Sequence, residues 1–367
     1  MLMGKKIIIC CDGTGNQLGE TYSNVVKIYS VIKKIPGKQI AFYDPGVGTF
    51  SYSNVVIPLW RRIKQGIDLA LGLGLEENVT QAYSFLMENY EDGDEVFLFG
   101  FSRGAYTTRV LAGLITQMGL LQKGCQNLIP YAWDSYRLCY KKEVKKVSKQ
   151  FKDYYAREVK IRFLGIWDTV SSIGLLFGYK HYPNTLRNHG VEIVRHAMAI
   201  DERRRFYRTN MFKKNRSTQD IKQVWFAGVH SDVGGSYPLN ESGLAQVSLK
   251  WMIREAAIAK IEFDDELIKQ VIPSTDQADN SAPSYAGKIH KSLTGGWWLA
   301  ELWPKRIRTT GKIRMPLGEP RAMYIDPSKN EIVPVIHRSV QQRIDDKNLN
   351  YAPKNLMLPS KSYKIED

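Results

Sequence analysis

The chain has 367 residues, of which 43% are hydrophobic and 24% charged, as expected of a folded globular protein. This length allows one large α/β domain with insertions or two average domains, and a core that needs no metal or disulfide. An aromatic share of 11% excludes a disordered chain. The net charge of +15 indicates anionic partners, such as phospholipid surfaces or acidic substrates. Nucleic acid is not expected, because no recognition motif accompanies the charge.

The four cysteines, Cys10, Cys11, Cys125 and Cys139, show no CxxC spacing. We therefore expect neither a zinc site nor a disulfide framework, and no metal or other cofactor. The apolar stretch near the N-terminus ends at Asp12, too soon for a signal peptide, and no run approaches the roughly 18 apolar residues of a membrane span. These features predict a protein that is cytoplasmic at synthesis, with any export through a route that cleaves no leader.

Short apolar runs alternate with helical patterns through the first two thirds of the chain. Each run has the length of a parallel strand that is covered on both faces. The alternation predicts an α/β fold with a doubly wound, mostly parallel sheet and helices on both faces. The predicted strands are Lys6–Cys11, Gln39–Tyr43, Glu95–Phe101, Lys160–Trp167 and Gln223–Val229; the predicted helices are Ser23–Lys34, Gly104–Met118, Ser242–Ala259 and the segment VEIVRHAMAIDERRRF at 191–206.

Residues 1–262 and 263–367 differ in character. The first range holds the alternation and is interpreted as one α/β core, with a basic insertion at about residues 124–160. Prolines accumulate in the second range, which we interpret as an irregular extension packed on the core. Three segments are assigned within this scheme: Lys141–Arg162 is a basic helical stretch, Ala322–Ile325 and Ile332–Ile336 are strand-like, and Ile57–Leu75 is either an apolar lid or a packed helix.

A GxSxG pattern from Gly100 to Gly104 marks the most informative turn of the chain. The pattern alone is weak evidence, because it arises by chance in many sequences. Its context is specific, since the strand DEVFLFGF precedes Ser102 and the helix RGAYTTRVLAGLI follows it. This is the arrangement of a nucleophile elbow, in which glycines permit a tight turn that presents Oγ above the sheet. The alternative is that Ser102 only caps the helix.

A serine nucleophile needs a base, and the base needs an acid that orients it. Asp168 follows one predicted strand, in WDTVSSIG, and His230 follows the next, in GVHSDVGGSY. Both stand where the carboxyl ends of parallel strands open, in the chain order of α/β hydrolases. The pattern predicts a triad of Ser102, Asp168 and His230. Asp232 is the main rival for the acid and would otherwise orient its own loop, whereas His196 is expected to be structural.

Backbone N–H groups are expected to bind the oxyanion. One is that of Arg103, directly after the nucleophile, and the second is that of Gly13 or Thr14, in the glycine-rich turn after the first strand. The alternative is a purely structural turn that Asp12 caps. Asp12 also permits an aspartate-nucleophile phosphatase, although Thr14 stands where such enzymes usually carry a second acid.

A tryptophan-rich basic segment, GGWWLAELWPKRIRTTGKIR, occupies residues 295–314. Indoles favour the headgroup level of a bilayer, and cations favour anionic lipid. Trp297, Trp298 and Trp303 therefore predict a peripheral contact with an anionic membrane. The alternative is that these tryptophans belong to the core and the neighbouring cations are solvated.

Four motifs, CDGTGN, GFSRGAYTTR, WDTV and GVHSDVGG, occur in this order. In this combination the chain resembles the α/β-hydrolase family of type VI secretion phospholipase effectors and their uncharacterised relatives. The resemblance covers roughly residues 5–260, and HRSVQQR in the extension is also similar. It implies an α/β-hydrolase-like fold and a Ser-Asp-His esterase, with Ser102, Asp168 and His230 at the matching positions and phospholipid as substrate. The chain is shorter than many secreted effectors, which carry large added domains.

These observations predict a serine hydrolase that cleaves carboxylic esters through an acyl-enzyme, as a phospholipase or lipase does. Two alternatives from other classes stay open. One is a non-catalytic adaptor that keeps the fold and binds anionic membrane surfaces. The other is a phosphatase that uses Asp12.

Overall fold

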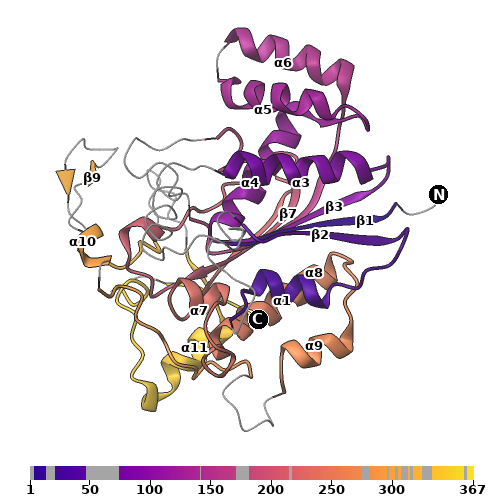
Figure 1. The fold of residues 1–367 in the computed structure, drawn as a ribbon. Coiled ribbons are helices and arrows are strands. Elements are labelled where there is room, and N and C mark those ends of the chain that lie inside the picture. Colours follow the sequence, from indigo (N-terminus) through magenta and orange to yellow (C-terminus); the bar gives the residue numbers. More distant parts are fainter. Residues whose placement is uncertain are drawn as a thin grey trace, which may run out of the picture.

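An eight-stranded sheet with helices on both faces forms the centre of the molecule (Figure 1). This computed structural model describes residues 4–13, 21–46, 74–140, 142–170, 182–214, 217–274, 282–295, 297–301, 305–306, 313–314, 317–324, 333–358 and 362–367. The strand order is β12-β11-β8-β7-β6-β3-β1-β2, and all neighbouring pairs are parallel. The strands are β1 (Lys6–Cys11), β2 (Gln39–Asp44), β3 (Glu95–Phe101), β6 (Ile161–Trp167), β7 (Val191–Ala199), β8 (Asp220–Phe226), β11 (Val335–His337) and β12 (Lys364–Glu366). The predicted α/β-hydrolase-like, doubly wound sheet is confirmed.

Strand β1 shows why the strands of this sheet are continuous apolar runs. Ile7 and Ile9 pack into the apolar cluster on one face, whereas Ile8 and Cys10 pack into the cluster on the other. Successive side chains of a strand point to opposite faces, so a strand covered on both faces needs apolar residues at every position. Helices α3 (Leu75–Asn89), α4 (Arg103–Met118), α5 (Ile129–Leu138) and α6 (Lys142–Tyr155) lie on the first face, and α1 (Asn24–Val31), α8 (Gly243–Ile258), α9 (Asp265–Val271) and α11 (Arg338–Asp345) on the second (Figure 1).

The strand order reverses direction between β1 and β3. From β1 the chain proceeds to β2 on one side, whereas β3, β6, β7 and β8 follow one another on the other side. Loops that leave the carboxyl ends of β1 and β3 therefore diverge, which opens a crevice at that edge. The turns that contain Gly13 and Ser102 both lie there.

The basic insertion is a hairpin of α5 and α6. Its base is closed by β4 (Leu120–Leu121), which pairs antiparallel with β5 (Ala156–Arg157). Phe151 of α6 packs on Tyr131 of α5, with ring centroids 4.9 Å apart, and attaches the hairpin to the main core. The predicted basic helix is confirmed over the bounds of α6, and the described residues after it form β5, a short connection at 158–160 and the start of β6.

The helix predicted for residues 191–206 is wrong, because this segment forms β7 and the loop after it. Most of the strand is buried, with Val194 in the first apolar cluster and Ala197 in the second. An apolar run covered on both faces has no helical or alternating period of its own, so periodicity does not separate it from a buried helix.

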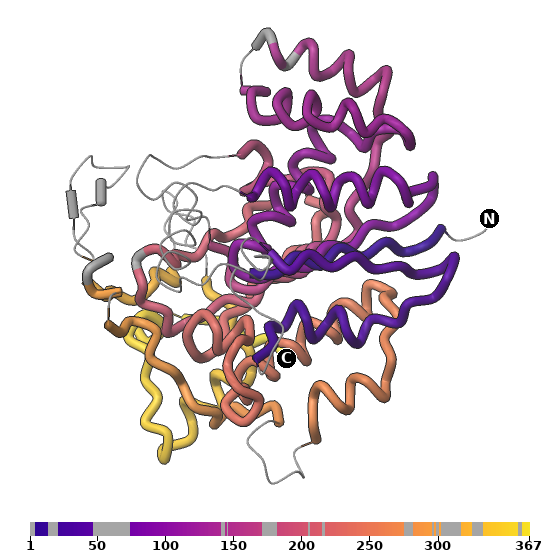
Figure 2. The backbone as a smooth tube through the Cα atoms, in the orientation of Figure 1, coloured from indigo at the N-terminus to yellow at the C-terminus, as the bar shows by residue number. Residues whose placement is uncertain are grey.

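The extension contributes directly to the sheet. Strands β11 and β12 continue it beyond β8, and Met323, Ile336 and Leu356 complete a third apolar cluster with Met198 and Trp225. In Figure 2 the orange-to-yellow extension surrounds the end of the sheet where α7 lies. The division at residue 262 stays a prediction. The remaining elements are α7 (His230–Gly234), α10 (Trp297–Glu301), β9 (Lys305–Arg306) and its antiparallel partner β10 (Ile313–Arg314).

Two segments of the extension were expected to be strand-like, and both expectations need correction. Residues Ala322–Tyr324 form no strand, and among the described residues of the second segment, 333–336, Val335 and Ile336 lie in a strand, β11. The segment Ile57–Leu75, predicted to be either an apolar lid or a packed helix, lies outside the described residues except for its last two. Its final residue, Leu75, begins α3.

Arg195 of β7 tests the contribution of buried charge to this fold. Its guanidinium pairs with Glu255 of α8 and with Asp220, and Glu255 is 2% exposed. Arg195→Met leaves that buried carboxylate with the more exposed Lys222 and Arg254. We expect the free energy of unfolding, measured by urea denaturation, to fall by about 3 kcal/mol.

The matched control for this experiment is Arg162→Met. Arg162 pairs with Glu192 at 2.7 Å, and both side chains are about one third exposed. Removal of this solvent-screened pair should cost less than about 1 kcal/mol. If the two variants lose the same free energy of unfolding, burial does not increase the contribution of the Arg195 pair to stability.

Candidate active site

Ser102 occupies the turn between β3 and α4 in a conformation that few non-glycine residues adopt. Its φ is 58° and its ψ is −118°. Such strain persists only where the surroundings enforce it, and it is frequent at functional sites. The Ser102 amide donates to the Trp167 carbonyl at 3.1 Å, and the Val170 amide donates to the Ser102 carbonyl at 3.4 Å. The residues that flank Asp168 thus hold the serine backbone beside that acid.

The glycines of the GxSxG pattern are required by close backbone approach. A Cβ at Gly104 would lie 2.1 Å from the Cys11 carbonyl oxygen, and one at Gly100 would lie 2.6 Å from the Gly104 carbonyl oxygen. Neither distance is compatible with a side chain. Helix α4 therefore packs directly on the ends of β1 and β3, which brings its N-terminus to the crevice.

Asp168 and His230 form the hydrogen-bonded acid–base pair that the sequence predicts. Asp168 Oδ2 lies 2.5 Å from His230 Nδ1, and Asp168 Oδ1 accepts the Ala199 amide at 3.1 Å. Asp168 follows β6 with a φ of 38°, and His230 is the first residue of α7. Both side chains are almost completely buried.

The His230 ring lies between two aromatic rings. Its centroid is 4.6 Å from that of Phe101, which precedes Ser102, and 4.7 Å from that of Tyr207, which meets it edge-on. Glu202 accepts the His230 amide at 3.2 Å. Burial lowers the pKa of His230, and the hydrogen bond to Asp168 only partly opposes it. The imidazole is therefore neutral at neutral pH, the state that a general base requires.

Arg321, a residue of the extension, forms a bidentate ion pair with Asp168. Its Nη1 lies 2.6 Å from Oδ1 and its Nη2 lies 2.9 Å from Oδ2. The same guanidinium donates to the carbonyl oxygens of Ala199 and Tyr207. Burial alone would raise the pKa of Asp168, but Arg321 and His230 together hold it well below its usual range. The sequence analysis missed this residue, for which no local motif provides a signal.

The turn after β1 is organised by Asp12. Its Oδ1 accepts the Gly13 amide at 2.6 Å, and its Oδ2 accepts the Ser23 hydroxyl at 2.6 Å and the Tyr43 hydroxyl at 2.9 Å. Asp12 is 2% exposed. A buried carboxylate engaged at both oxygens is a poor nucleophile, so the geometry disfavours the phosphatase alternative.

Of the three residues expected to donate to the oxyanion, Gly13 and Arg103 lie at this crevice. A Cβ at Gly13 would lie 3.4 Å from Ser102 Cβ, so that turn borders the serine. The Gly13 N–H is directed to Asp12 in this structure, however. Arg103 begins α4, where the helix N-terminus favours negative charge. Thr14 lies outside the described residues.

Asp232, the rival acid, bonds to its own loop and to His290 instead of His230. Its Oδ2 accepts the amides of Val229 and His290 at 2.9 and 3.1 Å, and its Oδ1 lies 2.6 Å from His290 Nδ1. Burial raises the pKa of Asp232, and these bonds oppose that shift. The carboxylate therefore fixes the loop that presents His230, the alternative role given to it from the sequence.

His196 is a buried residue of β7. Its Nε2 accepts the Thr169 amide at 3.3 Å, and burial lowers its pKa to about 3, so it stays neutral. Within the described ranges, no group of three or more His, Cys, Asp or Glu side chains is placed to hold a metal ion. In those same ranges, no helix combines the length and the apolar character needed to cross a membrane.

Two of the three tryptophans expected at a membrane are described. Trp297 packs edge-on against Tyr207 at 5.5 Å and contacts the Arg204 guanidinium at 5.0 Å. Trp298 is 51% exposed. Trp303 lies outside the described residues. Because Tyr207 also contacts His230, one side chain separates Trp297 from the His230 imidazole.

Comparison with known families gives this arrangement a context. The family model "T6SS, Phospholipase effector Tle1-like, catalytic domain" matches residues 5–255. The chain belongs to this family. The match includes the turns of Gly13, Ser102, Asp168 and His230. Arg321 lies outside the matched range.

Three individual proteins share parts of this sequence or fold. The uncharacterized protein YEL023C of Saccharomyces cerevisiae is 36% identical over 217 residues, 55% of this chain and 32% of that protein, so the chain aligns with about a third of its relative. A solved structure of an uncharacterized Pseudomonas aeruginosa protein has a TM-score of 0.43 and 17% identity, covering 77% of this chain and 49% of that chain. A Tle1 effector bound to the VgrG spike of the type VI secretion system has a TM-score of 0.35 and 19% identity, covering 74% of this chain and 62% of that chain.

Substitution of Arg321 should make stability depend on pH in a predictable way. Because the pKa of Asp168 lies below its ordinary value of 3.8, the ion pair stabilises the fold above about pH 4 and loses this effect as the pH falls through the lower folded-state value. Arg321→Gln should therefore lower the free energy of unfolding by about 3 kcal/mol at pH 7. Urea denaturation from pH 3 to pH 8 should show the difference narrowing at the acid end; a constant difference would contradict the assignment.

Proposed function

We propose that the protein is a serine hydrolase that cleaves carboxylic esters of phospholipids through an acyl-enzyme. The observation that carries the proposal is the strained Ser102 turn, which hydrogen bonds hold beside Asp168, together with the 2.5 Å contact between Asp168 and His230. Membership in a family of phospholipase effector catalytic domains supports lipid as the substrate.

In the proposed mechanism, each residue of the triad has one role. Asp168 accepts a hydrogen bond from the Nδ1–H of His230, which leaves Nε2 as the base that removes the Ser102 proton. Ser102 Oγ attacks the ester carbonyl, and the Arg103 N–H together with a second amide from the turn after β1 binds the oxyanion. His230 then protonates the leaving alcohol. Water activated by the same imidazole releases the fatty acid.

The surroundings of the imidazole also suit this cycle. Phe101 and Tyr207 restrict the ring, and Glu202 fixes its backbone, so little ordering remains when substrate binds. When the imidazolium forms, the ionised Asp168 stabilises it, and Arg321 keeps that carboxylate ionised.

Removal of the nucleophile tests the proposal directly. Ser102→Ala should abolish labelling by a fluorophosphonate probe and lower ester turnover by about 10⁶-fold. His230→Ala should lower turnover to a similar extent, and the double variant should be no worse, because the two residues act as a unit. Mass spectrometry of the products formed from mixed phospholipids measures turnover and reports which ester bond is cleaved.

Ser284→Ala is the matched control, since this serine lies in the extension and only caps a local turn. It should keep wild-type labelling and turnover. Full turnover by folded Ser102→Ala would end the proposal. Absence of labelling in folded wild-type protein would favour the adaptor alternative.

A peripheral membrane contact through Trp298 is proposed as part of this function. Half of its indole surface is exposed, close to the site, and the chain is strongly basic. Trp298→Ala should weaken co-sedimentation with anionic vesicles by about tenfold, the loss of roughly 1.5 kcal/mol of apolar burial. Added salt should weaken binding of the wild type as it screens the charge.

The control is Tyr154→Ala, which removes an aromatic side chain that is 79% exposed on α6. Vesicle binding of this variant should match that of the wild type. If both variants bind like the wild type, or if neutral vesicles bind as tightly as anionic ones, Trp298 has no role at the membrane.

A further inference from the structure

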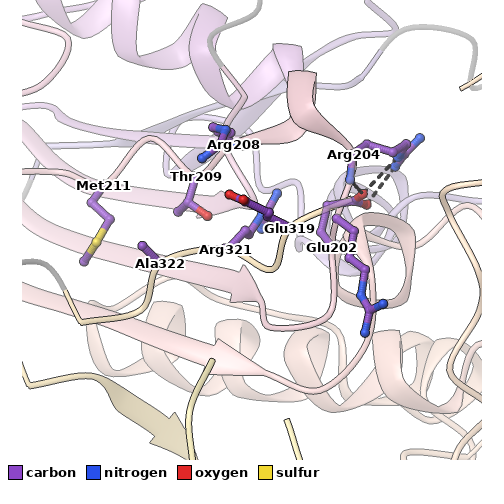
Figure 3. A pocket seen from close by; sticks show the side chains of 9 residues that line it. Glu202, Arg204, Arg208, Thr209, Met211, Glu319, Arg321 and Ala322 are labelled. Atoms are coloured by element: carbon purple, nitrogen blue, oxygen red, sulfur yellow. Dashed lines mark hydrogen bonds and ion pairs between the residues drawn. The ribbon is translucent and has the colours of Figure 1, made fainter. Parts of the chain in front are cut away.

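A small cavity rich in arginine is lined in part by Arg321, the partner of Asp168 (Figure 3). Its volume is about 170 Å³, and it is formed by the loop after β7 and by the segment that contains Arg321. Four guanidinium groups and two carboxylates line it, those of Arg203, Arg204, Arg208, Arg321, Glu202 and Glu319. The cavity touches the triad through Arg321, which pairs with Asp168, and through Glu202, which accepts the His230 amide.

The charges of this cavity do not balance. Glu202 is engaged by Arg204, by Ser292 and by the His230 amide, and Arg321 is engaged by Asp168. Arg203 and Arg208 are exposed and form no ion pair with any described residue. Two unpaired cations therefore border a concave site whose other cations are held in place by buried partners.

Two buried donors at the same cavity also lack a partner. Arg321 Nε and Thr209 Oγ1 are inaccessible to solvent and bond to no described residue. The Arg321 side chain is only 5% exposed, and both residues line the cavity. Because neither atom faces the open space, both belong to the packed wall of the cavity, and the donors available to a ligand are the exposed guanidinium groups of Arg203 and Arg208.

We propose that this cavity binds a phosphate-type oxyanion, either a lipid headgroup phosphate or free phosphate. A tetrahedral oxyanion offers only acceptors, which matches the fork geometry of the guanidinium groups that line the cavity. The site adjoins the triad, because Arg321 pairs with Asp168 and Glu202 accepts the His230 amide.

Inorganic phosphate is the probe for the first experiment. Titration calorimetry at constant ionic strength should show saturable binding to wild-type protein. Arg203→Gln/Arg208→Gln should weaken it by about tenfold or more, since each charge-assisted bond removed is worth at least that ratio. Lys213→Gln/Lys214→Gln is the matched control, because it removes two exposed cations that follow the same loop but do not line the cavity.

Three outcomes decide the binding proposal. Loss of binding in the arginine pair with retention in the lysine pair supports it. Equal weakening in both pairs shows general charge attraction and overturns it, as does the absence of saturable binding to the wild type. Ser102→Ala should bind phosphate like the wild type. Binding without any ester turnover would therefore leave the cavity assigned while the proposed hydrolase function fails.

A second experiment separates the two sources of phosphate, and this arm rests on the proposed hydrolase function. It compares hydrolysis of phosphatidic acid and of diacylglycerol in identical detergent micelles. If the cavity takes the headgroup, the arginine pair raises KM for phosphatidic acid alone. If it takes free phosphate, added phosphate alters turnover of both lipids in the wild type and of neither in the arginine pair.

Discussion

The ionised carboxylate of Asp168, buried without access to water, is the constraint on which the rest of this structure depends. An isolated charge in such a place costs several kcal/mol, so it must be met by charged and polar partners. His230 meets it from one side, and Arg321 meets it with two hydrogen bonds from the other. Because Arg321 comes from the extension, the Asp168 carboxylate gains its full set of polar partners only when residues beyond the family match have folded over it.

That requirement explains how the extension is built. Its strands β11 and β12 continue the central sheet, and Met323, two residues beyond Arg321, is 1% exposed in the third apolar cluster. Apolar burial around Met323 therefore fixes the backbone from which the guanidinium reaches Asp168. Removal of either partner of such a pair leaves an uncompensated buried charge, which favours the arrangement in which both are present. In this chain the favoured arrangement is the one in which the acid is charged and oriented.

Local features of the site were readable in the sequence, whereas its long-range partners were not. The Ser102 turn has a signature because its tight geometry needs glycines on both sides, and the following helix repeats every 3.6 residues. The strand β7 was misread as a helix because burial on both faces erases the two-residue period. Arg321 stands 153 residues from Asp168, and no short pattern records a partner at that separation. The acceptor at Glu202 was missed for a related reason, since it lay inside the misread segment.

The double engagement of Asp168 also sets how its charge acts on the imidazole. Burial lowers the pKa of His230. The guanidinium of Arg321 acts in the same direction, because a carboxylate that it neutralises in part attracts a proton on His230 less strongly. Both effects favour a neutral base before reaction, at the cost of a less stabilised imidazolium during it. Charge outside the triad also acts on His230, since Arg204 lowers the pKa of the imidazole and Glu202 raises it. The loop after β7, which carries both residues, therefore takes part in setting the basicity of the histidine.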